Sequence, residues 1–222
     1  MAPTPSKDSL APGENSMSVE PTNDLPARKK AIREKAHADR NAQPDKDELS
    51  RLICQKVVDS AAYRASRAVM YYVDVRSEVR TRHALPASLE HHKKIVVPYC
   101  VDGELELFHL ESMDELALGM YRILEPKAEL RSSPGKSVDV REIDFILVPG
   151  VAFTRDGARM GHGFGYYDKL LGHARPESPL VALAFECQLF ADLPTESHDI
   201  FMDRVVTERA VYPGRGRGGK AG

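Results

Sequence analysis

Four short, predominantly apolar runs constrain the fold of this chain more than any other feature. They occupy residues 68–73, 95–98, 143–148 and 180–185. Predominantly apolar runs of this length are typical of strands buried on both faces of a parallel sheet. Segments with helical spacing or helix-start signals lie between them. This alternation predicts an α/β fold: a single domain with a mostly parallel sheet flanked by helices on both faces, which is a doubly wound, Rossmann-like three-layer arrangement.

Helices are indicated at several places between these runs. Residues 28–40 contain neither Gly nor Pro and carry only a weak apolar stripe, so we expect a mostly exposed helix there. Asp45, after Pro44, is expected to cap the next helix, with Glu48 at the capping-box position. We also expect a polar helical segment interrupted at Pro86, a helix over residues 166–172, and further strands at 105–110 and 204–207.

The two ends of the chain differ in composition from its centre. Residues 1–26 are rich in Pro, Ser, Asn and Glu and have few large apolar side chains. Such a segment does not bury enough apolar surface to offset its ordering entropy, so it is interpreted as a disordered extension. Residues 214–222 are rich in Gly, Arg and Lys and are expected to form a disordered tail. The predicted α/β domain therefore spans residues 27–213.

The net charge and the cysteines limit which binding partners and which cell compartment we expect. The net charge is −2, so nothing in the composition requires a nucleic acid or an anionic membrane as partner. The three cysteines, Cys54, Cys100 and Cys187, are scattered and odd in number, which argues against a disulfide framework. No apolar run has the length of a signal-peptide core or a membrane span. We expect a cytoplasmic protein, and a monomer because no long heptad pattern stands out.

A glycine-rich segment follows the third apolar run and precedes the helix expected at 166–172. Gly161, Gly163 and Gly165 alternate there, and glycines allow backbone N–H groups to approach a phosphate closely. Arg159 adds a charged donor, and the Asp168 carboxylate is suited to Mg²⁺. The spacing matches neither the Rossmann fingerprint nor the P-loop. Spacing alone therefore leaves two interpretations open, an anion site or a flexible hairpin before a helix.

The wider sequence around the glycines is more specific. Residues 147–171, LVPGVAFTRDGARMGHGFGYYDKLL, resemble the signature of the 5-formyltetrahydrofolate cyclo-ligase family, also called methenyltetrahydrofolate synthetase. Weaker similarities occur in the family's order at 29–33 (KKAIR), 78–81 (EVRT), 123–126 (ILEP) and 184–208. Together they cover residues 28–209. The resemblance implies that ATP and 5-formyltetrahydrofolate are converted to 5,10-methenyltetrahydrofolate, ADP and phosphate, with Mg²⁺.

The same resemblance implies a set of site residues. The expected ATP-binding residues are Lys29, Lys30, Arg33, Arg159, Met160, Gly161, His162, Gly163, Phe164, Gly165, Tyr166 and Tyr167. The expected folate-binding residues are Val73, Glu78, His162, Gly163, Phe164, Gly165 and Tyr166. Asp168 and Asp199 are the expected Mg²⁺ ligands. No residue is assigned as a general acid, a general base or a nucleophile.

Each of these assignments has a purely structural alternative. Lys29 and Arg33 share one helix face, and their spacing alone favours a solvated basic surface; the family resemblance favours contact with ATP. Asp168 also suits the first turn of any helix. His162 and Phe164 depart from the family, which usually carries Arg or Tyr, and Lys or Gly, at those positions. Two further hypotheses therefore stay open: a diverged paralogue acting on another formyl- or carboxyl-bearing substrate, and a nucleotide- or RNA-binding module using the basic helix and the RGRGG tail.

Overall fold

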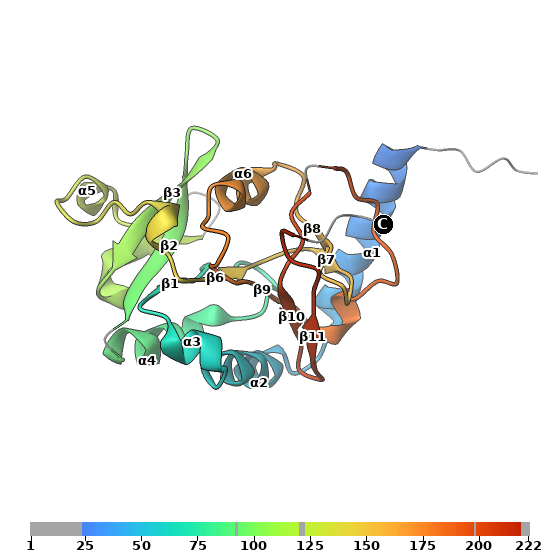
Figure 1. The fold of residues 1–222 in the computed structure, drawn as a ribbon, viewed down its shortest axis with the longest axis horizontal. Coiled ribbons are helices and arrows are strands. Elements are labelled where there is room, and N and C mark those ends of the chain that lie inside the picture. The colour runs from blue at the N-terminus through green and yellow to red at the C-terminus, as the bar shows by residue number, and fades with distance from the viewer. Residues whose placement is uncertain (1–23, 92, 120–122, 198, 219–222) are drawn as a thin grey trace, which may run out of the picture.

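A seven-stranded sheet forms the centre of the molecule (Figure 1). The computed structural model describes residues 24–91, 93–119, 123–197 and 199–218. Among them the strand order is β11-β10-β9-β6-β1-β2-β3. These strands are β1 (Ala68–Met70), β2 (Lys94–Val101), β3 (Glu104–Leu110), β6 (Phe145–Val148), β9 (Leu180–Leu183), β10 (Arg204–Val206) and β11 (Val211–Pro213). Strands β10, β9, β6, β1 and β2 pair in parallel, and β11 and β3 are antiparallel edges. The predicted, mostly parallel sheet is confirmed.

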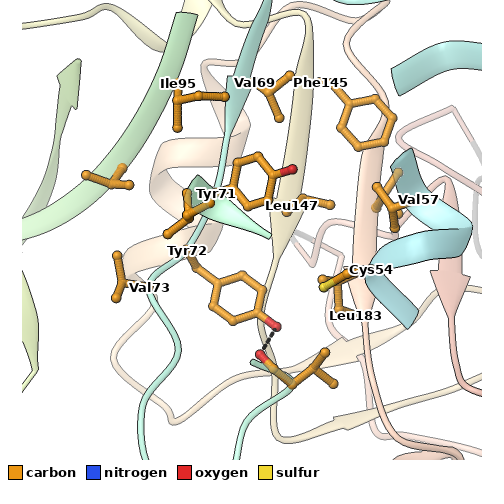
Figure 2. Close-up of a cluster of buried hydrophobic side chains, with 14 of the residues drawn as sticks. Cys54, Val57, Val69, Tyr71, Tyr72, Val73, Ile95, Phe145, Leu147 and Leu183 are labelled. Carbon is orange, nitrogen blue, oxygen red and sulfur yellow. Dashed lines mark hydrogen bonds between the residues drawn. The ribbon is translucent and has the colours of Figure 1, made fainter. Parts of the chain in front are cut away.

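Alternate residues of the central strands enter two separate cores, because successive side chains of a strand point to opposite faces. Val69 and Leu147 join the core beneath helices α2 (Lys46–Val58), α3 (Ala61–Ala65) and α4 (Leu85–Glu90). Figure 2 shows this core, with Cys54 and Val57 of α2 facing the strand side chains. Met70 and Ile146 join the opposite core with α6 (Tyr166–Gly172). Helices therefore cover both faces, as expected for a doubly wound fold.

The first helix, α1 (Leu25–Ala42), packs outside these layers against a small hairpin of β7 (Ala152–Phe153) and β8 (Arg159–Met160). Ala36 of α1 is fully buried against Ala152 and Met160. The remaining elements are a second hairpin, β4 (Leu116–Leu118) and β5 (Leu124–Pro126), with helix α5 (Ala128–Arg131) and short 3₁₀ turns η1 (Thr81–His83), η2 (Met113–Glu115), η4 (Val140–Glu142) and η5 (Glu186–Gln188). The packing of α1 places its basic face beside the glycine-rich segment.

Two local predictions about helix starts are wrong. Asp45 has a left-handed backbone (φ 53°) and makes no side-chain cap hydrogen bond, so the expected capping box does not form. The tight connection from α1 imposes this conformation, and Lys46 donates from Nζ to the carbonyl of Asn41 at 2.9 Å, near the end of α1. Pro86 does not interrupt a helix. It lies in the first turn of α4, where its missing N–H has no helical partner to lose.

The C-terminal segment is held more firmly than its composition indicates. Gly214 N donates to Asp203 O at 2.9 Å, and Gly216 N donates to Met202 O at 3.1 Å. Arg217 donates to the carbonyls of Ala174 and Pro176. The predicted start of the disordered tail at residue 214 is therefore too early, because residues 214–217 make tertiary hydrogen bonds. Residues 219–222 and 1–23 lie outside the described residues. Within the described part, no helix is long and apolar enough to cross a membrane.

The strand order fixes where a ligand site is expected. From β1 the chain builds β2 and β3 on one side, and β6, β9, β10 and β11 on the other. The connections leave neighbouring strands β1 and β6 in opposite directions, which opens a crevice at their carboxyl ends. Val73 follows β1 there, and Gly150 follows β6.

Candidate active site

A cavity of about 430 Å³ lies at this switch point. Its walls come from the segments after β1 and β6, the glycine loop (residues 159–168), α1, the β2–β3 and β4–β5 hairpins, and the loop at 194–199. The predicted residues that line it are Lys29, Arg33, Val73, Glu78, Arg159, Met160, Gly161, His162, Gly163, Phe164, Gly165, Tyr166, Tyr167, Asp168 and Asp199. Residues assigned from four distant parts of the sequence are thus brought into one cavity.

Lys30 is the predicted site residue that the structure places elsewhere. It does not line the cavity, its side chain is 78% exposed, and its Nζ lies 3.9 Å from Glu34 Oε1 one turn along α1. Lys29 and Lys30 are neighbours on a helix and therefore point in different directions. Lys30 is therefore part of a solvated basic surface, while Lys29 faces the cavity.

Arg33 binds the glycine loop directly. Its Nε donates to Gly161 O at 3.0 Å, and a side chain at Gly163 would bring its Cβ to 3.4 Å from Arg33 Nη2. Gly163 (φ 102°) and Gly165 (φ 71°) both adopt backbone conformations that disfavour other residues. The glycines are therefore needed for the path of the loop beside the Arg33 guanidinium.

Arg159 lies beneath the loop with only 3% of its side chain exposed. Its Nη2 is 2.6 Å from Asp168 Oδ1, and its guanidinium lies over the Tyr167 ring at 5.7 Å. Its Nε is buried without a hydrogen-bond partner among the described residues. A buried cation with spare donor capacity at a cavity wall is suited to an anionic ligand.

Lys29 pairs with a residue that the sequence did not single out. Its Nζ lies 2.6 Å from Glu196 Oε2, and Glu196 N donates to Asp199 Oδ2 at 2.7 Å. All three residues line the cavity. Nothing local marks Glu196 in the sequence, because its role depends on a contact with a helix more than 160 residues earlier.

Glu78 is buried on the opposite wall. Its Oε2 accepts from Val75 N at 3.1 Å, and its Oε1 lies 3.6 Å from His162 Nε2 of the glycine loop. The His162 ring stacks on His37 of α1, with ring centroids 5.4 Å apart. Burial, and then the nearby Arg40, lower the pKa of His37. This wall therefore couples a carboxylate to two imidazoles.

Aromatic rings form much of the remaining surface. Phe164 is 70% exposed, and its ring stacks on Tyr166 at 5.4 Å and 14°. Burial raises the pKa of Tyr167, the next residue. Across the cavity Tyr99 donates to Glu106 Oε2 at 2.5 Å, and burial together with this hydrogen bond raises its pKa to about 12. Flat faces of this kind suit a flat heterocyclic ligand.

Two carboxylates are available for a metal ion. Asp168 and Asp199 line the same cavity, but the described residues contain no group of three or more His, Cys, Asp or Glu arranged to hold a metal. Mg²⁺ is commonly held by one or two carboxylates together with substrate phosphates and water. The two side chains therefore fit a cation that arrives with a nucleotide, and they do not form a complete protein cage.

A doubly wound sheet with a cationic, glycine-lined cavity at its switch point is typical of α/β proteins that bind phosphorylated ligands. The comparison with known families is more specific: residues 26–208 match the profile of the 5-formyltetrahydrofolate cyclo-ligase family. The chain belongs to this family. The resemblance inferred from the glycine segment is confirmed.

Individual relatives agree with this assignment. The chain is 30% identical over 173 residues to 5-formyltetrahydrofolate cyclo-ligase of Mus musculus, covering 72% of this chain and 82% of the relative. It is 29% identical over 184 residues to the Arabidopsis thaliana protein named 5-formyltetrahydrofolate cyclo-ligase, mitochondrial, covering 72% of this chain and 66% of that longer relative. The solved structure of 5,10-methenyltetrahydrofolate synthetase from Aquifex aeolicus superposes with a TM-score of 0.73 at 30% identity, over 87% of this chain and 95% of that one.

Proposed function

We propose that this protein converts 5-formyltetrahydrofolate and ATP into 5,10-methenyltetrahydrofolate, ADP and phosphate. The observation that carries the proposal is the assembly of the cavity: apart from Lys30, every residue assigned from the family resemblance lines it. Relatives with this activity in their names cover most of the chain. The protein is thus an ATP-using ligase of one-carbon metabolism.

The chemistry begins with a weak electrophile. The formyl group on N5 is an amide, whose carbon is deactivated by the nitrogen lone pair. Transfer of the γ-phosphoryl group to the formyl oxygen turns that oxygen into a leaving group. N10 then attacks the formyl carbon, the C–O bond breaks, and phosphate leaves as the imidazoline ring closes.

This reaction asks the protein for positioning and for charge stabilisation, more than for a covalent intermediate. Lys29, Arg33 and Arg159 provide positive charge along the nucleotide side of the cavity. The loop glycines allow the phosphates to approach the backbone closely. Burial of the Arg159 guanidinium strengthens its interaction with an anion.

The folate side is assigned to the opposite wall. Val73 lies beyond β1, and Glu78 offers carboxylate oxygens to the N–H and amino groups of a pterin ring. Tyr166 and Phe164 present stacked aromatic faces at the rim. His162 lies between the two sides and contacts Glu78. We therefore assign the reacting formyl oxygen to the space between the two sides, facing the terminal phosphate.

Asp168 and Asp199 are the proposed Mg²⁺ ligands. These two carboxylates would hold a Mg²⁺ ion that arrives with the nucleotide, and the ion would supply charge neutralisation for phosphoryl transfer. Asp168 pairs with Arg159, and both residues line the cavity.

The RNA-binding alternative has less support. Arg215 pairs with Asp156, and Arg217 donates to backbone carbonyls, so these tail guanidinium groups are engaged within the domain. The cytoplasmic location and the monomeric state stay predictions. The Arabidopsis relative carries a mitochondrial designation in its name, which makes cell fractionation a useful check.

The direct test mixes the purified protein with Mg·ATP and 5-formyltetrahydrofolate and follows the absorbance of the methenyl product. We expect product only when both substrates are present, with ADP formed in equal amount. ATP binding without folate turnover would favour the diverged paralogue. Absence of both nucleotide binding and product would refute the proposal.

A further inference from the structure

Arg40 lies in the last turn of α1. It is among the largest fully buried side chains of the described residues and is 1% exposed. All three guanidinium nitrogens have a partner. Nε donates to Ser77 Oγ at 3.1 Å, Nη1 donates to Gly150 O at 3.2 Å, and Nη2 lies 3.4 Å from His37 Nδ1. None of the ion pairs found among the described residues joins Arg40 to a carboxylate. Burying a guanidinium among neutral acceptors costs free energy unless its N–H groups are hydrogen-bonded. The role of Arg40 therefore lies in the segments that it connects.

The partners of Arg40 lie at or beside three separate segments that line the cavity. Ser77 immediately precedes Glu78, the buried carboxylate of the folate side. Gly150 follows β6 at the switch point and lines the cavity. His37 stacks on His162, the residue of the glycine loop that contacts Glu78. One side chain thus joins α1 to both sides of the site.

The segments at Gly150, Ser77 and His162 depend on Arg40 to different degrees. Gly150 O also accepts from Gln188 Nε2 at 3.1 Å, so this segment has a second support. Ser77 has one further tie to α1, because its Oγ donates to Asn41 Oδ1 at 2.7 Å. The link to His162 runs through the His37 ring, which Arg40 contacts directly. Gln188 Nε2 also donates to Val151 O at 3.0 Å, so the end of β6 keeps two hydrogen bonds without Arg40. Loss of Arg40 is therefore expected to loosen the segments at Glu78 and His162 more than the end of β6.

We propose that Arg40 is a positioning residue that holds Glu78 and His162 in the arrangement both substrates need. This inference rests on the proposed function, in which Glu78 faces the folate and the glycine loop faces the nucleotide. Arg40 itself does not line the cavity, so it acts through Ser77 and His37 and not by contact with a substrate. Displacing such supports weakens binding and turnover without removing a reacting group.

The test compares Arg40→Met, which keeps most of the side-chain volume without donors, with Arg40→Lys, which keeps the charge. Arg40→Met is expected to raise KM for both ATP and 5-formyltetrahydrofolate about tenfold, the size of a lost hydrogen bond to a charged group. Arg40→Lys is expected to recover only part of the loss, because one ammonium group does not reach three divergent acceptors.

Arg217→Met is the matched control. Arg217 also donates to several backbone carbonyls, those of Ala174, Pro176 and Ser178, but it lies away from the cavity. Its loss should lower Tm while changing either KM by less than about twofold. Equal KM values for Arg40→Met and Arg217→Met, at a temperature where both are folded, would show that Arg40 is merely structural.

Two single substitutions test separately the contact of Arg40 with Ser77, beside Glu78, and its contact with His37, beside His162. Ser77→Ala should raise KM for 5-formyltetrahydrofolate more than KM for ATP, because it frees the loop beside Glu78. His37→Ala should raise KM for ATP more than that for the folate, because it removes the stacking support of the glycine loop. Identical changes of both KM values in the two variants would contradict separate roles for Ser77 and His37.

The outcome also distinguishes this inference from the proposed function. A wild-type protein that forms no methenyl product refutes the function, and calorimetric binding of ATP to Arg40→Met and Arg217→Met then decides the role of Arg40. A wild-type enzyme that is active, with Arg40→Met indistinguishable from the control, refutes the role of Arg40 alone.

Discussion

The Asp168 carboxylate has two roles to fill at the same position. It pairs with Arg159 at 2.6 Å, and under the proposed function it also contacts Mg²⁺ when nucleotide is bound. An Asp suits both because a carboxylate has two oxygens that accept independently. The pair also keeps the Arg159 charge compensated until a phosphate arrives.

Asp168→Asn separates these roles. The amide keeps the size of the side chain but is a weaker ligand for a hard cation, so we expect kcat to fall about 10- to 100-fold. The Mg²⁺ concentration that gives half-maximal rate should rise at the same time. Measuring rate against Mg²⁺ concentration distinguishes this from a general loss of fold, which lowers the rate without shifting the Mg²⁺ requirement. Unchanged activity would show that the metal assignment is wrong.

At the scale of elements, the residues just before β10 and just after β11 depend on a close backbone approach. A Cβ on Gly214 would lie 1.9 Å from Met202 O and 3.2 Å from the Cα of Gly157, while one on Gly218 would meet nothing within 4 Å. Gly214 thus allows the C-terminal segment to lie against the turn before β8, whose residues continue into the glycine loop.

Gly214→Ala is therefore expected to destabilise the protein by about 1–3 kcal/mol, the usual cost of overpacking. Gly218→Ala is the matched control and should leave the free energy of unfolding nearly unchanged. Urea unfolding of both variants measures the difference. Equal stability of the two would mean that residues 214–217 are as loosely held as the composition suggested.

The sequence predicts some elements well because their signals are local. Helix α6 occupies the predicted residues, since the glycine loop before it and the spacing within it leave few alternatives. The run 68–73 forms a paired strand only to Met70, because the chain then leaves the ladder to build the cavity wall. Asp45 could not be predicted, because its backbone conformation depends on the preceding helix.

At the scale of the whole molecule, the site is assembled from segments that no local pattern connects. The family resemblance identifies the individual pieces, and strand order places them together at the switch point. Arg40 and Glu196 escape prediction for a physical reason. Arg40 stands on a basic helix, where a charged residue is normally solvated, and only acceptors from distant segments make its burial favourable. Glu196 is an exposed loop residue whose role depends on its contact with Lys29 of α1.

The central claim concerns the fate of one oxygen atom. If the formyl oxygen accepts the γ-phosphoryl group and leaves with it, 5-formyltetrahydrofolate labelled with ¹⁸O in the formyl group must pass its label to inorganic phosphate. Mass spectrometry of the phosphate, with the methenyl product measured in the same sample, tests this directly. We expect one labelled oxygen in phosphate for each methenyl group formed. Methenyl product accompanied by unlabelled phosphate, with the label in water, would contradict it.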